Sequence, residues 1–265
     1  MSKMSNQIIQ TALDSGDPGD ASKAIEEIDL LLASLSEPTE RAQLLLRKAL
    51  FLERLGQFDA ALSELQRAKC EALDDIVIQV QREHITAGVH YQQHHFEEAY
   101  QESTAILTKY GDQLKRPDTR FIYEDIQQFR AFSLVQLLKF SDAIPLLHEI
   151  LEFQLKEDDV PFALINLGIC YSRVGRYEEA VSYLVKGLQL CPDYEWEAEA
   201  HCQLGIAYAH LKELHGAKRE LQIYEKMAAT YPLRMEKVYG WLWRVCVELG
   251  QEEESQHYRR LARPC

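Results

Sequence analysis

The 265-residue sequence contains few glycines and prolines, 12 and 8 respectively, and no stretch approaching about 18 consecutive apolar residues. The scarcity of helix-breaking residues argues against long disordered tracts. The lack of an apolar run argues against a membrane-spanning helix, and the N-terminal residues lack the apolar segment of a secretory leader. We therefore expect a folded protein that does not insert into membranes, and a cytoplasmic location is the simplest interpretation.

The cysteines are also few and scattered, with no Cys-x-x-Cys pair among the six. Several fall on apolar helix faces, where cysteine behaves as a small hydrophobic residue. This distribution favours a reducing compartment over a disulfide framework. The six are Cys70, Cys170, Cys191, Cys202, Cys246 and Cys265.

Positively charged residues are outnumbered: the sequence has 29 Lys and Arg but 42 Asp and Glu, which gives a net charge of −13. An acidic surface repels phosphate backbones, so we expect no nucleic-acid partner. A protein or peptide partner with an extended or helical contact segment that is neutral to basic suits this charge better. The alternative is that the charge serves only to keep the protein soluble.

The residues that are abundant, Leu, Ala, Glu, Gln and Arg, are strong helix formers. Within residues 161–192, small and large residues recur at spacings that suit two closely packed helices. The pair Leu167-Gly168 precedes Gly175, which is placed to end the first helix in a left-handed C-cap. The second helix then begins near Tyr177. A helix-turn-helix unit is therefore predicted here.

The same unit repeats along the chain at a period near 37 residues. A small residue opens the second helix of each unit, and successive small residues are 37, 38, 44, 37, 37 and 38 positions apart. These residues are Ala24, Ala61, Ala99, Ala143, Ala180, Ala217 and Ser255. A fixed period of this size is the signature of a solenoid, in which stacked units bury a continuous core.

Residues 161–192 resemble a tetratricopeptide repeat, with Leu167-Gly168, Tyr171 and Ala180 at the family's spacing. The departures are Leu164 for Trp, Leu184 for the usual aromatic residue, and Gly187 for Ala. The resemblance extends unevenly over nearly the whole chain. It implies an all-α, right-handed α-solenoid of about seven antiparallel helix hairpins that forms a single domain.

The repeat divides the chain into units of similar length. A degenerate first unit is expected at 1–38 and a C-terminal capping unit at 233–265, with an inter-repeat loop at 111–119. The five repeat units between them are expected at 39–73, 74–110, 120–156, 157–193 and 194–232.

In tetratricopeptide proteins the first helix of each unit lines a concave groove, and the resemblance implies the same here. In some members of the family, an asparagine at the place of Asn166 binds a peptide backbone. Glu199 and Gln203 stand where a carboxylate-binding clamp would need Lys and Arg, which argues against capture of an acidic tail. The groove candidates are Gln81, His84, Tyr91, Gln128, Phe132, Asn166, Arg173, Gln203, His210, Trp241 and Arg244.

Four histidines crowd one unit, at His84, His90, His94 and His95. His90 and His94 have the four-residue spacing that can place two metal ligands on one helix face. No cysteine joins them and no glutamate follows the first one, so we expect no metal site. No phosphate-binding loop, nucleophile elbow or dinucleotide motif is present either, so neither a cofactor nor catalysis is expected.

The sequence thus favours a scaffold or adaptor that binds a protein or peptide in the groove. One alternative is a peptide-responsive regulator or chaperone-like protein whose curvature changes on binding. An enzyme is less favoured than either, because the motifs of catalysis are missing.

Overall fold

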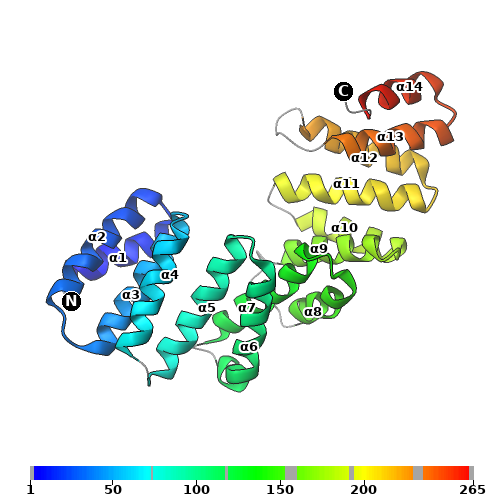
Figure 1. The fold of residues 1–265 in the computed structure, drawn as a ribbon. Helices are drawn as coiled ribbons and strands as arrows, with labels where there is room; N and C mark the ends of the chain where they lie inside the picture. Colours follow the sequence, from blue (N-terminus) through cyan, green and yellow to red (C-terminus); the bar gives the residue numbers. More distant parts are fainter. Residues whose placement is uncertain are drawn as a thin grey trace. The chain divides into compact units, whose positions relative to one another are not determined.

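The computed structural model describes residues 3–72, 74–116, 119–152, 160–190, 194–228 and 235–262 (Figure 1). All regular structure within these ranges is helical, and it comprises fourteen α-helices without a strand. The predicted all-α solenoid of helix hairpins is confirmed. None of the described helices combines the length and the apolar character that crossing a bilayer would require.

Consecutive helices follow one another in pairs along the chain. Six of these pairs are in direct contact as hairpins. The pairs are α1 (Lys3–Ser15) with α2 (Pro18–Ser34), α3 (Pro38–Arg54) with α4 (Phe58–Glu71), α5 (Ile76–Gln92) with α6 (Phe96–Leu114), α9 (Val160–Arg173) with α10 (Tyr177–Leu190), α11 (Tyr194–His210) with α12 (Leu214–Ala228), and α13 (Glu236–Glu248) with α14 (Glu252–Leu261). The fourth predicted unit holds α7 (Arg120–Gln136) and α8 (Phe140–Glu152).

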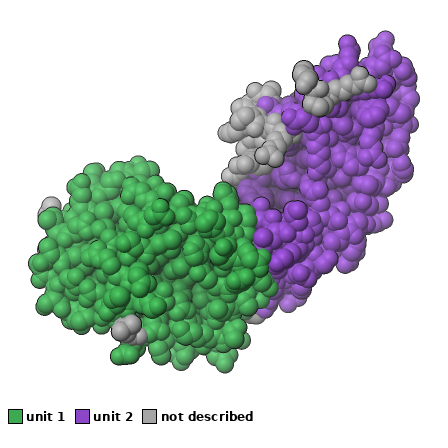
Figure 2. Space-filling view, in the orientation of Figure 1, with its two compact units in different colours: residues 1–133 green, residues 134–265 purple. Residues whose placement is uncertain are grey.

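The chain divides into two compact units, residues 1–133 and 134–265, which Figure 2 shows in green and purple. We call them unit 1 and unit 2 and describe each by itself. The division falls within α7, close to its C-terminal end.

The predicted core positions are buried. The alanines at the starts of the second helices, Ala24, Ala61, Ala99, Ala143, Ala180 and Ala217, all have 0% exposure, and Ser255 in the last hairpin has 5%. A larger side chain would push the paired helices apart at these places. The repeat period therefore records the positions where the hairpins are closely packed.

The Leu-Gly pair marks an especially close approach in the fifth hairpin. A Cβ atom on Gly168 would lie only 2.4 Å from Cγ of Leu184 on the partner helix. The repeat in the next hairpin has the same feature, since a Cβ on Gly205 would lie 2.7 Å from Cγ of Leu221. Glycine is needed here because no other residue leaves room for the facing leucine.

The turns within hairpins share one backbone geometry, in which a residue in the left-handed region follows the first helix. The backbone N–H of Arg176 donates to the carbonyl of Tyr171 at 2.9 Å, which completes a Schellman C-cap at Gly175. The predicted C-cap is thus confirmed. The residues with positive φ in these turns are Gly16 (65°), Gly56 (70°), His94 (62°), Leu138 (60°), Gly175 (81°), Lys212 (63°) and Gly250 (71°).

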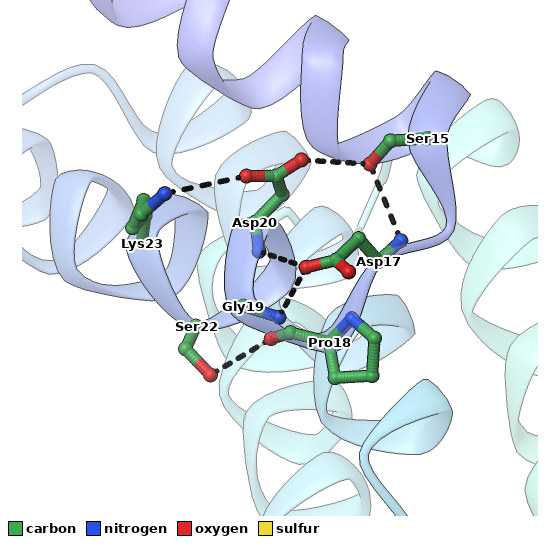
Figure 3. A network of polar contacts seen from close by, with 7 residues as sticks. All are labelled: Ser15, Asp17, Pro18, Gly19, Asp20, Ser22 and Lys23. Carbon is green, nitrogen blue, oxygen red and sulfur yellow. Dashed lines mark hydrogen bonds and ion pairs between the residues drawn. The ribbon is translucent and has the colours of Figure 1, made fainter.

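The turn between α1 and α2 has its own polar network (Figure 3). One carboxylate oxygen of Asp17 accepts from the backbone N–H groups of Gly19 at 2.7 Å and Asp20 at 3.1 Å, and so caps α2. The Asp20 carboxylate accepts in turn from the Ser15 hydroxyl and the Lys23 ammonium group. These bonds fix the start of α2 in the degenerate first hairpin.

The region predicted as an inter-repeat loop at 111–119 differs from the expectation, because α6 continues through Gly111 to Leu114. The Leu114 side chain has 0% exposure and belongs to the same apolar cluster as Ile122 and Ile126 of α7. Burial of this leucine outweighs the weak helix preference of the preceding glycine. Residues 117 and 118 lie outside the described part of the chain.

The cysteines of the described residues are free thiols. Cys170, Cys202 and Cys246 are buried, whereas Cys70 is exposed. Burial raises the pKa of the Cys170 and Cys202 thiols to about 12, which makes both of them poor nucleophiles. Cys191 and Cys265 lie outside the described residues.

Candidate peptide-binding surfaces

Unit 1 contains a cavity of about 490 Å³, here called the unit 1 cavity, on the first helices of its hairpins. Leu46 and Leu50 of α3, Ile85 of α5 and the exposed Val77 and Phe121 supply apolar lining. The remaining lining is Leu13, Gln43, Arg47, Gln81, His84 and Asp125. The predicted groove residues Gln81 and His84 therefore both lie at this cavity.

An aromatic and ionic arrangement holds His84 in place. Its Nε2 atom lies 3.1 Å from a carboxylate oxygen of Asp125 on α7. The imidazole also stacks on the ring of Phe129 at 6.0 Å between centroids. Because α7 orients His84 through two contacts, this side chain presents a fixed polar edge to the unit 1 cavity.

Glu53 of α3 contacts α5 but does not line the unit 1 cavity. Its carboxylate accepts a hydrogen bond from the Gln92 side chain at 2.9 Å. Burial raises the pKa of this carboxyl to about 7, against the opposing effect of Arg54, while the charge of Asp125 adds to the rise. The Arg54 guanidinium donates to backbone carbonyls near the end of α1, including that of Ala12 at 3.1 Å.

The other predicted groove residues of unit 1 do not line the cavity. Tyr91 is half-buried, with its ring stacked on Phe129 and edge-on to Phe96, each at 5.5 Å between centroids. Gln128 and Phe132 lie half-buried on α7.

Unit 2 contains a second cavity, also of about 490 Å³, here called the unit 2 cavity. It is formed by the end of α7, the turn to α8, and faces of α9, α11 and α12. Its lining residues are Val135, Gln136, Leu138, Phe140, Asn166, Ile169, Arg173, Trp196, Glu199 and Tyr224.

Two predicted groove residues, Asn166 and Arg173, lie on α9 at the unit 2 cavity. The Asn166 side chain is 2% exposed and donates from Nδ2 to the backbone carbonyl of Phe162 at 2.9 Å. This bond directs the amide and leaves its oxygen as an acceptor. The exposed Arg173 guanidinium lies 5.9 Å from the ring centre of Phe140.

Gln203 is nearly inaccessible, with 1% exposure, and donates to the carboxylate of Glu199 at 2.7 Å. Glu199 lines the unit 2 cavity but Gln203 does not. Gln203 therefore stands behind the surface, where it holds the glutamate in position.

The remaining predicted residues of unit 2 form an aromatic cluster. The His210 ring stacks on Tyr177 with centroids 4.2 Å apart and planes 5° apart, and it meets Trp241 edge-on at 5.1 Å. The Arg244 guanidinium lies 4.3 Å from the centre of the Trp241 ring. Burial, together with the charges of Arg244 and Lys212, lowers the pKa of His210, which favours the neutral imidazole in this stack.

The sequence did not predict that Leu138 and Trp196 would line a site. Leu138 occupies a turn position that is Gly56, Gly175 or Gly250 in three hairpins but His94 or Lys212 in two others, so an alignment of the turns would not have singled it out. Trp196 lies in the first turn of α11 and packs edge-on against Phe162 at 5.5 Å.

Two of the crowded histidines of unit 1 lie close together, with the rings of His90 and His95 6.1 Å apart between centroids, but their other contacts differ. His90 lies 2.9 Å from a carboxylate oxygen of Glu102, while His94 takes the turn position and packs against Phe96. Within the part of the chain that the structure describes, no three or more His, Cys, Asp or Glu side chains gather in a way that could hold a metal ion.

Comparison with known proteins supports the repeat. Residues 159–226 match the family model of the tetratricopeptide repeat. This segment contains α9, α10, α11, the greater part of α12 and most of the residues that line the unit 2 cavity. No curated protein sequence matches the chain significantly.

Solved structures with the same fold cover nearly the whole chain. A signal transduction ATPase with a tetratricopeptide repeat sensor, from Pyrococcus horikoshii, is 15% identical and covers 96% of this chain with a TM-score of 0.74. This chain spans only 41% of that protein. A tetratricopeptide repeat protein from Parabacteroides merdae is 15% identical, with 98% and 93% of the two chains covered and a TM-score of 0.59.

A third similar structure is that of PilW, a type IV pilus biogenesis factor. It is 15% identical, with 83% of this chain and 91% of that chain covered and a TM-score of 0.59. At these identities the likeness concerns the fold. Together with the family match over residues 159–226, it shows a tetratricopeptide repeat in this segment and the fold of tetratricopeptide repeat proteins over nearly the whole chain.

Proposed function

We propose that this chain is a scaffold or adaptor that binds an extended segment of another protein along the first helices of its hairpins. The observation that carries the proposal is that each unit has a cavity of about 490 Å³ lined mainly by residues of these helices. Both cavities combine apolar lining with a few polar groups, the usual composition of a recognition site.

The polar groups suit a peptide ligand. Side-chain amides at Gln81 in unit 1 and at Gln136 and Asn166 in unit 2 can bond a peptide backbone, because an amide both donates and accepts. Aromatic and arginine side chains, such as Trp241 and Arg244, can anchor the side chains of the ligand.

Charge favours a neutral to basic partner segment. Unit 1 contains 14 Lys and Arg against 22 Asp and Glu, which gives it a net charge of −8. This acidic field attracts a basic segment at long range and repels an acidic one.

The test measures capture of peptides by purified protein, first from a random octapeptide library and then with the best binder by fluorescence anisotropy. The double variant Asn166→Ala and Arg173→Ala should bind about tenfold more weakly, because it loses an amide acceptor and an anchoring side chain. The matched control is Arg219→Ala, an exposed arginine on α12, which should bind like the wild type.

Circular dichroism must show that the double variant remains folded. Wild-type affinity in the folded double variant would exclude the unit 2 cavity as the binding surface. If the wild-type protein captured no peptide from the library, the scaffold proposal itself would be refuted.

A further inference from the structure

Leu138 has an unfavourable backbone conformation for its residue type. Its φ is 60°, in the left-handed region where an L side chain crowds the following carbonyl oxygen. Gly56, Gly175 and Gly250 occupy the corresponding turn position in three other hairpins and avoid this strain, whereas His94 and Lys212 bear it at the same position in two more. The fold would accept glycine here, so the turn itself does not account for the leucine.

Burial does not account for the leucine either. The Leu138 side chain is 71% exposed, so its apolar burial is too small to offset the energy of the strained backbone. Backbone strain that local packing does not offset is typical of functional positions. The side chain lines the rim of the unit 2 cavity, where Phe140, Ile169 and Trp196 provide further apolar surface.

The charge of the unit 2 cavity indicates what it accepts. One guanidinium, that of Arg173, and one carboxylate, that of Glu199, lie in its lining. These opposite charges offset each other, so the cavity does not favour a ligand side chain of either sign. The amides of Gln136 and Asn166 are neutral groups that suit a peptide backbone.

We infer that Leu138 is a specificity residue that closes over a large, neutral, apolar side chain of the bound segment in the unit 2 cavity. The occupant is a leucine, methionine or phenylalanine side chain within an extended peptide. This inference rests on the proposed function and specifies what the unit 2 cavity selects.

The experiment compares wild-type protein with Leu138→Gly and Lys212→Gly. Lys212 is an exposed residue of the same unit with a nearly identical φ of 63°, and it does not line the cavity, so its variant is the matched control. The probe is a library of N-acetylated octapeptides in which one central position is varied among leucine, alanine, lysine and glutamate. Urea denaturation of all three proteins is followed by circular dichroism.

Both glycine variants should unfold at a higher urea concentration than the wild type, because both relieve left-handed strain. Wild-type protein and Lys212→Gly should prefer leucine over alanine at the varied position by about tenfold, the size expected for burial of a few methylene groups. Leu138→Gly should lose most of this preference. Leu138 would then improve binding at the expense of stability.

Several outcomes would overturn the inference. A leucine preference that Leu138→Gly retains would exclude Leu138 as a specificity residue, and a stronger response to lysine or glutamate would exclude a neutral occupant. A lower urea midpoint for Leu138→Gly would show that the leucine is a packing residue. Each of these results leaves peptide binding itself intact, whereas failure of the wild type to bind any library member would refute the proposed function as well.

Discussion

Replacement of Glu53 by glutamine should stabilise unit 1 at neutral and alkaline pH and have little effect in acid. The Glu53 carboxyl is largely buried, and its pKa rises from 4.5 to about 7 in the folded protein. A group with a raised folded-state pKa contributes stability that is fully present below its unfolded pKa. That stability is lost as the pH rises through the folded value.

The magnitude follows from the size of the rise in pKa. Each pKa unit corresponds to about 1.4 kcal/mol, so a rise from 4.5 to about 7 gives an upper limit of about 3.5 kcal/mol. Residual solvent access around Glu53 reduces this figure, and we expect about 1–3 kcal/mol. Glutamine keeps an oxygen that can accept the hydrogen bond from Gln92, so the neutral variant loses little else.

The assay is urea denaturation of the wild type and Glu53→Gln, followed by circular dichroism at several values between pH 4.5 and 8. The difference in unfolding free energy should grow with pH over this range and level off above about pH 7. Glu98→Gln, an exposed glutamate of unit 1, controls for the general loss of one negative charge. A difference that does not change with pH would refute the assignment of a buried, largely neutral Glu53.

Two further predictions concern packing and thiol chemistry. Gly168→Ala should lower the unfolding free energy by about 1–3 kcal/mol, because the added methyl group would clash with Leu184. The control is Gly240→Ala, at a helical position with open space around it, which should be neutral or slightly stabilising in the same urea experiment. Equal effects of the two substitutions would contradict the close approach of Gly168 to Leu184. In native protein at pH 8, iodoacetamide should modify the exposed Cys70 and spare the buried Cys202. Peptide mapping by mass spectrometry identifies the labelled cysteines, and rapid labelling of Cys202 in native protein would contradict its burial.

Much of the fold could be predicted from the sequence because each hairpin packs in the same way and therefore needs similar residues at the same positions. The small residues at a period near 37 and the pair Leu167-Gly168 report positions where helices touch, and no larger residue can replace them without displacing a helix. The C-cap at Gly175 was predictable for a local reason, since glycine takes the left-handed conformation at little cost.

Other features depend on tertiary structure and could not be read from local preference. The continuation of α6 past Gly111 depends on the burial of Leu114 against α7, which no local signal reports. Leu138 contradicts the backbone preference of its residue type, and Trp196 belongs to the site because α9 and α11 bring it there. The repeat register allowed the helix position of each groove residue to be estimated. It did not predict which of these residues line the same cavity.

The helix contacts in the described part of the chain join only helices that are adjacent or next but one in sequence. Chain segments therefore meet without closing long loops, a topology that favours rapid folding. Each hairpin also depends on its immediate neighbours alone, so an opening that begins in one hairpin need not involve the whole molecule. The rate of amide hydrogen exchange should then change from one hairpin to the next. The slowest exchange is expected in the fifth and sixth hairpins, where Gly168 and Gly205 allow the paired helices to approach closely.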